Sequence, residues 1–182
     1  MSIIILNKMG KLTLYIAASL DGFIAAENDN LDFLSKVALE GEDYGYHDFV
    51  SSVDTVILGK NTYDWVMKHV DEFPHANKKS FVITSKKMDP IGNITFYNGD
   101  LKELVESLKS NPDSHIFCDG GAQIVNQLLK LKQIDEIILS IIPIILGNGT
   151  RLFHEKNPSI DLELISNKSF ASGLVQLHYK QK

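Results

Sequence analysis

The stretch that decides the fold is Val56-Ile57-Leu58-Gly59-Lys60-Asn61-Thr62-Tyr63-Asp64. It predicts a short buried strand that stops at Gly59 and a helix that follows at once. A glycine at such a strand end lets a ligand approach the backbone, and the free N–H groups at a helix N-terminus attract an anion such as a pyrophosphate. A strand, a glycine and a helix also make an ordinary turn and cap, so this stretch alone leaves both interpretations open.

Strands and helices alternate along the rest of the chain. Apolar runs rich in β-branched residues predict strands at Leu12 to Ala18, Thr55 to Leu58, Ser80 to Thr84, Ile94 to Tyr97, Ile116 to Cys118 and Glu136 to Ile142, with Leu162 to Phe170 and Leu174 to Lys180 as a closing antiparallel hairpin. Helical spacing is expected in part of Leu31 to Ser52, and in Asn61 to Val70, Leu101 to Leu108 and Gln123 to Leu131. Ser19 to Asn30 and Pro143 to His154 read as irregular loops, and Glu136 to Ile142 as the central strand. The alternation predicts an α/β fold whose sheet is covered on both faces.

Two further strand ends carry residues suited to a ligand. The strand at Phe81 is followed by Ser85-Lys86-Lys87, whose hydroxyl and cations suit a terminal phosphomonoester, although a solvated basic loop is the simpler interpretation. Another strand ends in Asp119-Gly120-Gly121, where paired glycines admit an unusual backbone conformation and close contact with a flat ligand. Because the carboxyl ends of parallel strands meet at one edge of a sheet, we expect a single crevice there.

Composition limits the classes of function. The 182 residues suit one domain spanning residues 1–182, with residues 1–10 as a loose N-terminal extension. A net charge of -5 argues against nucleic acid as a partner, and the apolar run from Ile137 to Leu146 is too short for the roughly 20 residues that span a bilayer. Cys118 is the only cysteine and the six histidines lack metal-ligand spacing, so we expect a cytoplasmic protein with no disulfide and no metal site.

Five segments of the chain resemble dihydrofolate reductase and the related reductase domain of riboflavin biosynthesis. In order they are Ile16 to Ala25, Val56 to Asp64, Phe81 to Lys86, Asp119 to Gly121, and Pro143 to Gly149 with Leu152-Phe153. The first and last of them look closer to the riboflavin-type reductases and their bacterial relatives than to the folate enzymes. The resemblance implies a three-layer fold with a mixed central sheet of about eight strands and helices on both faces.

The same resemblance implies a cofactor, NADPH, and the residues that would hold it. Ala17 and Ile24 would flank the nicotinamide. The other residues that it implies are Gly59, Lys60, Asn61 and Thr62 at the phosphates, Thr84, Ser85 and Lys86 at the ribose phosphate, and Asp119, Gly120, Gly121, Ala122, Gln123 and Ile124 over the pyrophosphate and the nicotinamide ribose. We expect Tyr63 and Trp65 to pack against the sheet rather than to contact a ligand.

The implied activity is NADPH-dependent hydride transfer to a pteridine-like or pyrimidine-like heterocycle, by a chain that forms homodimers as the riboflavin-type relatives often do. In the folate enzymes an acid on the first helix binds the heterocycle, and counting back sixteen residues from Gly59 leads to Asp43. Its rivals are Asp32, Glu40 and Glu42, and a solvated helix residue is the simpler interpretation of Asp43. The alternative function is a dinucleotide-binding protein without catalysis. An acidic residue facing the nicotinamide would favour the enzyme.

Overall fold

The computed structural model describes residues 9–182, so most of the expected N-terminal extension lies outside the described residues. The strands are β1 (Lys11–Ser19), β2 (Phe23–Ala25), β3 (Thr55–Gly59), β4 (Lys79–Ile83), β5 (Ile94–Tyr97), β6 (His115–Gly120), β7 (Glu136–Ile142), β8 (Thr150–Arg151), β9 (Leu162–Ser169) and β10 (Val175–Gln181). The helices are α1 (Tyr46–Ser51), α2 (Lys60–Met67), α3 (Leu101–Lys109) and α4 (Ala122–Lys130), with short 3-10 helices η1 (Glu27–Asp29) and η2 (Asp32–Val37).

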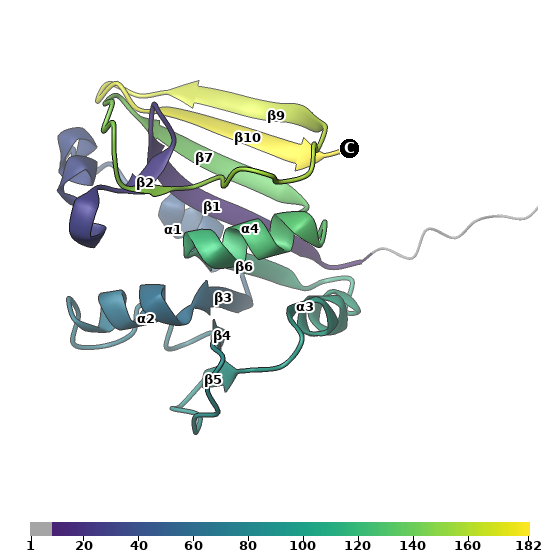
Figure 1. Ribbon diagram of the computed structural model, residues 1–182. Coiled ribbons are helices and arrows are strands. Elements are labelled where there is room, and N and C mark those ends of the chain that lie inside the picture. The colour runs from purple at the N-terminus through teal and green to yellow at the C-terminus, as the bar shows by residue number, and fades with distance from the viewer. Residues whose placement is uncertain (1–8) are drawn as a thin grey trace, which may run out of the picture.

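Eight of the strands form one mixed sheet, in the order β5-β4-β3-β6-β1-β7-β10-β9 (Figure 1). The first six strands of this order run parallel, while β10 is antiparallel to both β7 and β9. The predicted mixed sheet and its closing hairpin are therefore confirmed. The strand predicted to be central, β7, lies between β1 and β10, one place beyond the middle pair β6 and β1.

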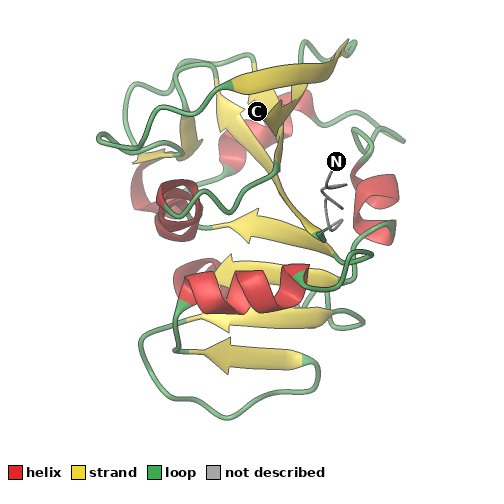
Figure 2. Cartoon of the chain, turned by 90° about the vertical axis from the view of Figure 1, so that its right-hand side faces the viewer, coloured by secondary structure: helices red, strands yellow, loops and turns green. Residues whose placement is uncertain are grey.

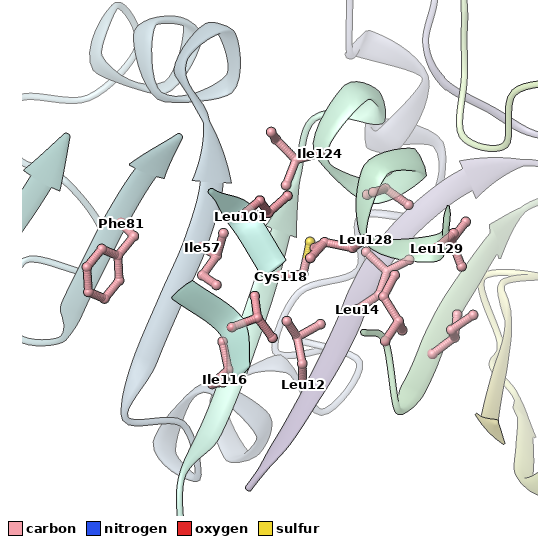
Figure 3. Close-up of a cluster of buried hydrophobic side chains, with 14 of the residues drawn as sticks. Leu12, Leu14, Ile57, Phe81, Leu101, Ile116, Cys118, Ile124, Leu128 and Leu129 are labelled. Atoms are coloured by element: carbon pink, nitrogen blue, oxygen red, sulfur yellow. The ribbon is translucent and has the colours of Figure 1, made fainter. Parts of the chain in front are cut away.

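Helices cover both faces of the sheet, because side chains alternate between the faces along each strand. One apolar cluster joins Leu12, Leu14 and Cys118 to side chains of α3 and α4 (Figure 3). A second cluster, on the opposite face, joins Phe117 to side chains of α1 and α2. Phe117 and Cys118 are neighbours on β6, and both are fully buried on opposite sides of it.

Several predicted boundaries change in the structure; α2, for example, ends at Met67 rather than at Val70. The loop expected at Ser19 to Asn30 contains β2, which pairs antiparallel with β8 in a small separate sheet. The strand expected to stop at Cys118 continues through Gly120, and Gly120 is buried. Neither feature has a local signal of its own, because a strand of two or three residues depends on a partner far along the chain.

The parallel strands end at one edge of the sheet, so the segments that follow them lie close together there. Figure 2 shows the arrowheads of neighbouring parallel strands on the same side. This edge brings together the segments that follow β3, β4 and β6, as expected from the sequence. Within residues 9–182, no helix has the length and apolar character needed to cross a membrane.

Candidate active site

A large cleft lies at the carboxyl edge of the parallel strands. Its volume is about 1740 Å³, and its walls come from β1, β3, β4 and β6 and from both sides of the sheet. Pockets for one small ligand usually measure roughly 300–1,000 Å³. The cleft therefore has room for a dinucleotide and a second molecule beside it.

Two glycines face each other in the middle of the cleft. A Cβ atom on Gly121 would lie 2.9 Å from Thr62 Oγ1 and 3.7 Å from the Cα atom of Gly59, and the φ angle of Gly121 is +84°. The gap that these glycines leave lies between the first residues of α2 and α4, whose N-terminal N–H groups lack helical partners. A narrow space between two helix N-termini fits a pyrophosphate.

One end of the cleft is cationic. Gly59 pairs with Ile83 across β3 and β4, so Lys60 lies beside the segment that follows β4. That segment contributes exposed Lys86 and Lys87 to the lining, together with the hydroxyls of Thr84 and Ser85. Such a group can bind a phosphomonoester through charge-assisted hydrogen bonds.

The other end of the cleft is aromatic and acidic. The rings of Tyr15 and Tyr46 meet edge to face with centroids 5.6 Å apart, and Trp65 and Asp119 line the same cleft. Burial raises the pKa of both tyrosines, and the charge of Asp119 raises the pKa of Tyr46 further. Both hydroxyls therefore keep their protons at neutral pH.

Hydrogen bonds attach Tyr15 to the loop that precedes α1. Its hydroxyl donates to the carbonyl oxygen of Tyr44 at 3.0 Å and accepts from Gln176 Nε2 at 3.0 Å. Gln176 Nε2 also donates to Ser140 Oγ at 3.1 Å. This network holds the aromatic wall of the cleft against β7 and β10.

Asp119 is the carboxylate of this end that comes directly from the sheet. The pairing of β6 with β3 is irregular at Asp119, and its contact with His75, whose ring packs on Phe117, shows that its side chain lies on the face that carries Phe117. Its side chain is 23% exposed, and its Oδ2 atom lies 3.6 Å from Nε2 of the buried His75. The sequence placed Asp119 with the cofactor contacts and offered no signal for His75.

The structure brings nearly all of the expected cofactor residues into this cleft. The lining includes Ala17, Ile24, Gly59, Lys60, Asn61, Thr62, Thr84, Ser85, Lys86, Asp119, Gly121, Ala122, Gln123 and Ile124. Gly120 is buried at the end of β6 and is not part of the lining. Tyr63 packs in the core as expected, whereas Trp65, which was also expected to pack, lines the cleft.

Asp43 does not reach the cleft. It is exposed in the loop before α1, where its carboxylate accepts hydrogen bonds at 2.9 Å from the N–H groups of Gly45 and His47. The bond from His47, followed by that from Gly45, lowers its pKa. Its rivals Asp32, Glu40 and Glu42 are also exposed and outside the lining.

Asp43 lies outside the cleft because of the local backbone geometry before α1. Gly41, Tyr44 and Gly45 adopt positive φ angles, so the chain turns repeatedly before α1 begins at Tyr46. Asp43 thus precedes the helix and accepts a hydrogen bond from the His47 N–H group in its first turn, and the residue that this segment presents to the cleft is Tyr46.

Comparison with known proteins agrees with this fold. The RibD C-terminal domain family matches residues 10–176. YwjB of Bacillus subtilis (strain 168), an uncharacterized protein, is 42% identical over 170 residues, which cover 93% of this chain and 97% of YwjB. YyaP of the same organism, also uncharacterized, is 31% identical over 185 residues, covering 94% and 95% of the two chains.

Two solved structures show the same architecture. A protein from Shewanella sp. PV-4, provisionally named a riboflavin biosynthesis protein, is 30% identical with a TM-score of 0.85, over 94% of this chain and 99% of its own. A diaminohydroxyphosphoribosylaminopyrimidine deaminase/5-amino-6-(5-phosphoribosylamino)uracil reductase from Thermotoga maritima is 17% identical with a TM-score of 0.68, over 96% of this chain and 57% of its own, and shows the fold alone. The expected resemblance to the riboflavin-type reductases is confirmed. The chain belongs to the RibD C-terminal domain family.

Proposed function

We propose that this protein is an NADPH-dependent reductase that delivers a hydride to a pyrimidine-like or pteridine-like heterocycle. The observation that carries the proposal is the distribution of charged, glycine and aromatic residues along this cleft. Cations and hydroxyls line one end, paired glycines and two helix N-termini form the middle, and an acid among aromatic side chains lines the other end. This order matches a molecule with phosphates at one end and a reactive ring at the other, beside a second ring.

The cofactor fits the residues present. Thr84, Ser85 and Lys86 would hold the ribose phosphate, since charge-assisted contacts to that group are the strong ones. Gly59 and Gly121 would leave room for the pyrophosphate, because side chains there would fill the gap. When bound, NADPH supplies the hydride, and the protein supplies orientation and charge.

The acidic end would hold the substrate. An ionised carboxylate accepts hydrogen bonds, so Asp119 suits the amino-imine edge of a flat heterocycle and can hold or release a proton there. The rings of Tyr15 and Tyr46 supply a wall for stacking, and Leu31 and Leu34 of the same cleft exclude water. The role first expected of Asp43 thus passes to Asp119.

A second candidate function is a dinucleotide-binding protein without catalysis. It would share the cationic end and the paired glycines of the cleft. Such a protein needs no acid to exchange a proton with a substrate, so an Asp119 carboxylate that faces the substrate ring favours the enzyme.

The test combines binding with turnover. Trp65 is the only tryptophan and lines the cleft, so its fluorescence should report titration with NADPH and with NADH. Oxidation of NADPH would then be followed with ribosylaminouracils, with and without phosphate, and with dihydropterins. Reduction of one of these rings supports the proposal. NADPH binding with no reduction of any of them supports a dinucleotide-binding protein without catalysis. Absence of NADPH binding refutes both functions.

A variant pair sharpens the assignment of the acid. Asp119→Asn should lower turnover by roughly a hundredfold or more and leave NADPH affinity unchanged, because an amide cannot supply the proton that completes the reduction. Asp43→Asn, at an exposed aspartate outside the cleft, is the matched control and should leave turnover unchanged. The opposite pattern would return the role to Asp43.

A further inference from the structure

We propose that His75 is a positioning residue, whose imidazole holds the Asp119 carboxylate in the orientation from which it meets the substrate. The inference rests on the proposed function in one respect, that Asp119 faces the substrate. It starts from a histidine that lies outside the cleft lining and that the cofactor does not require.

His75 is enclosed in the protein. It lies between α2 and β4 and is 3% exposed. The rings of Phe73 and Phe117 meet it edge to face, with centroids 5.5 and 5.7 Å away and interplanar angles of 82° and 86°. These rings fix the imidazole plane, and an apolar side chain of similar size would pack there without the cost of burying two ring nitrogens.

The hydrogen bonding of the ring is incomplete. Nδ1 is buried and has no hydrogen-bond partner among residues 9–182, while Nε2 lies 3.6 Å from Asp119 Oδ2. An ionised carboxylate only accepts hydrogen bonds, so the favourable arrangement places a proton on Nε2. Buried polar atoms nearly always have a hydrogen-bond partner. The unpaired Nδ1 atom therefore indicates that a histidine is needed here for the contact between Nε2 and Asp119.

The distance of 3.6 Å is an electrostatic contact rather than a hydrogen bond. Contacts of this kind are often long in a free enzyme and tighten when the substrate is bound. A movement of a few tenths of an ångström would let Nε2 donate to Oδ2.

The contact with His75 gives the two carboxylate oxygens of Asp119 different surroundings. Among the described residues, His75 is the one group in ion-pair range of Asp119, and no hydrogen bond to either Asp119 oxygen is present. With Oδ2 turned toward His75, Oδ1 stays available to the cleft that Asp119 lines. Without the imidazole, the carboxylate would be free to rotate, and fewer substrate encounters would have the productive geometry.

Two substitutions separate positioning from packing. His75→Leu keeps an apolar side chain and removes the donor, so kcat should fall roughly tenfold to a hundredfold while NADPH affinity, measured by Trp65 fluorescence, stays unchanged. His75→Gln offers an amide N–H close to the position of Nε2 and should recover most of kcat. His47→Leu, at an exposed histidine outside the cleft, is the matched control.

A double-mutant cycle then tests whether His75 acts through Asp119. If it does, His75→Leu should cause no further loss of kcat in the Asp119→Asn protein. An equal fold-change in both backgrounds would overturn the inference, and so would failure of His75→Gln to recover any activity in a folded protein.

A spectroscopic measurement on the wild-type protein makes the inference independent of turnover. Nitrogen-15 NMR of the histidine rings, with the His75 signals assigned through His75→Gln, should show a proton on Nε2 and a changed signal in Asp119→Asn. A proton on Nδ1 alone would overturn the inference. If no heterocycle is reduced, the proposed function fails, while the NMR result still decides whether His75 holds Asp119.

Discussion

Lys60 Nζ lies 2.6 Å from both carboxylate oxygens of Asp64, one turn along α2, and both side chains line the cleft. The lysine expected to meet a cofactor phosphate is thus already paired within its own helix. Both partners are partly exposed, at 27% and 46%. A phosphate that binds Lys60 therefore competes with Asp64 for its ammonium group.

Removing that competitor should strengthen cofactor binding. Asp64→Asn frees Lys60 and removes a negative charge from the cleft, so we expect NADPH to bind roughly two to five times more tightly, as suits a pair worth under about 1 kcal/mol. Fluorescence titration of Trp65 measures the change. Glu106→Gln breaks the corresponding i,i+4 pair with Lys102 on α3, outside the cleft, and should have no effect. Weaker binding in Asp64→Asn would show that the pair supports the site.

The cationic end should determine the choice of cofactor. NADPH should bind more tightly than NADH, and Lys86→Ala should reduce that preference roughly threefold to tenfold, because an exposed charge pair contributes modestly. Lys102→Ala, at an exposed lysine outside the cleft, is the control. Equal dissociation constants for the two cofactors in the wild-type protein would refute the assignment of this end.

The paired glycines should tolerate no side chain. Gly121→Ala places a Cβ atom 2.9 Å from Thr62 Oγ1, in the gap assigned to the pyrophosphate, so NADPH affinity should fall at least about tenfold. Gly41→Ala is the matched control, since its φ of +77° is similar and nothing lies within 4 Å of the added atom. Both variants should lose stability through backbone strain. Only Gly121→Ala should lose affinity, and equal affinities would make this turn purely structural.

The turn that follows β1 should make the free energy of unfolding depend on pH. The Asp21 carboxylate accepts hydrogen bonds from Ser19 Oγ at 2.6 Å and from the N–H groups of Leu146 and Gly147 at 3.0 and 2.7 Å. The bond from Ser19 is the largest cause that lowers its pKa, to about 2. The folded state therefore favours the ionised form.

The pH range follows from the sign of this shift. The stabilisation is complete above the unfolded pKa of about 3.9 and is lost as pH falls through about 2. Asp21→Asn should melt at a lower temperature than the wild-type protein at pH near 7, and the difference should shrink between about pH 4 and pH 2. Asp71→Asn, at an exposed aspartate outside this turn, is the control. A difference that stays constant with pH would contradict this account.

The strands were predictable because their signals are local. Glu136–Ile142 and Ile94–Tyr97 form strands at the bounds that the sequence predicted, since each is a short apolar run between breaking residues. The pair β2 and β8 was missed because Phe23 and Arg151 meet only through the tertiary fold. Residues 128 positions apart, 151 less 23, leave no pattern within a local window.

The assignment of the acid, first to Asp43 and then to Asp119, also shows which features are local in the sequence and which depend on the tertiary fold. Counting back from Gly59 to Asp43 assumes a constant loop length, and the loop before α1 turns at Gly41 and Gly45 and leaves Asp43 in solvent. Asp119 was visible in the sequence beside its glycines. Its direction depends on the irregular pairing of β6 with β3 at this residue, which no local sequence pattern predicts.

The sequence by itself determined the eight strands of the main sheet and the helices between them, the glycine and hydroxyl residues at the ends of three strands, and the family resemblance. These features depend on side-chain type and spacing over a few residues. Only the tertiary structure decided that Trp65 lines the cleft, that Lys60 is paired with Asp64, and that His75 lies behind Asp119. His75 and Asp119 are 44 residues apart, 119 less 75, and their contact exists only because the chain between α2 and β4 packs its imidazole against Phe117 of β6.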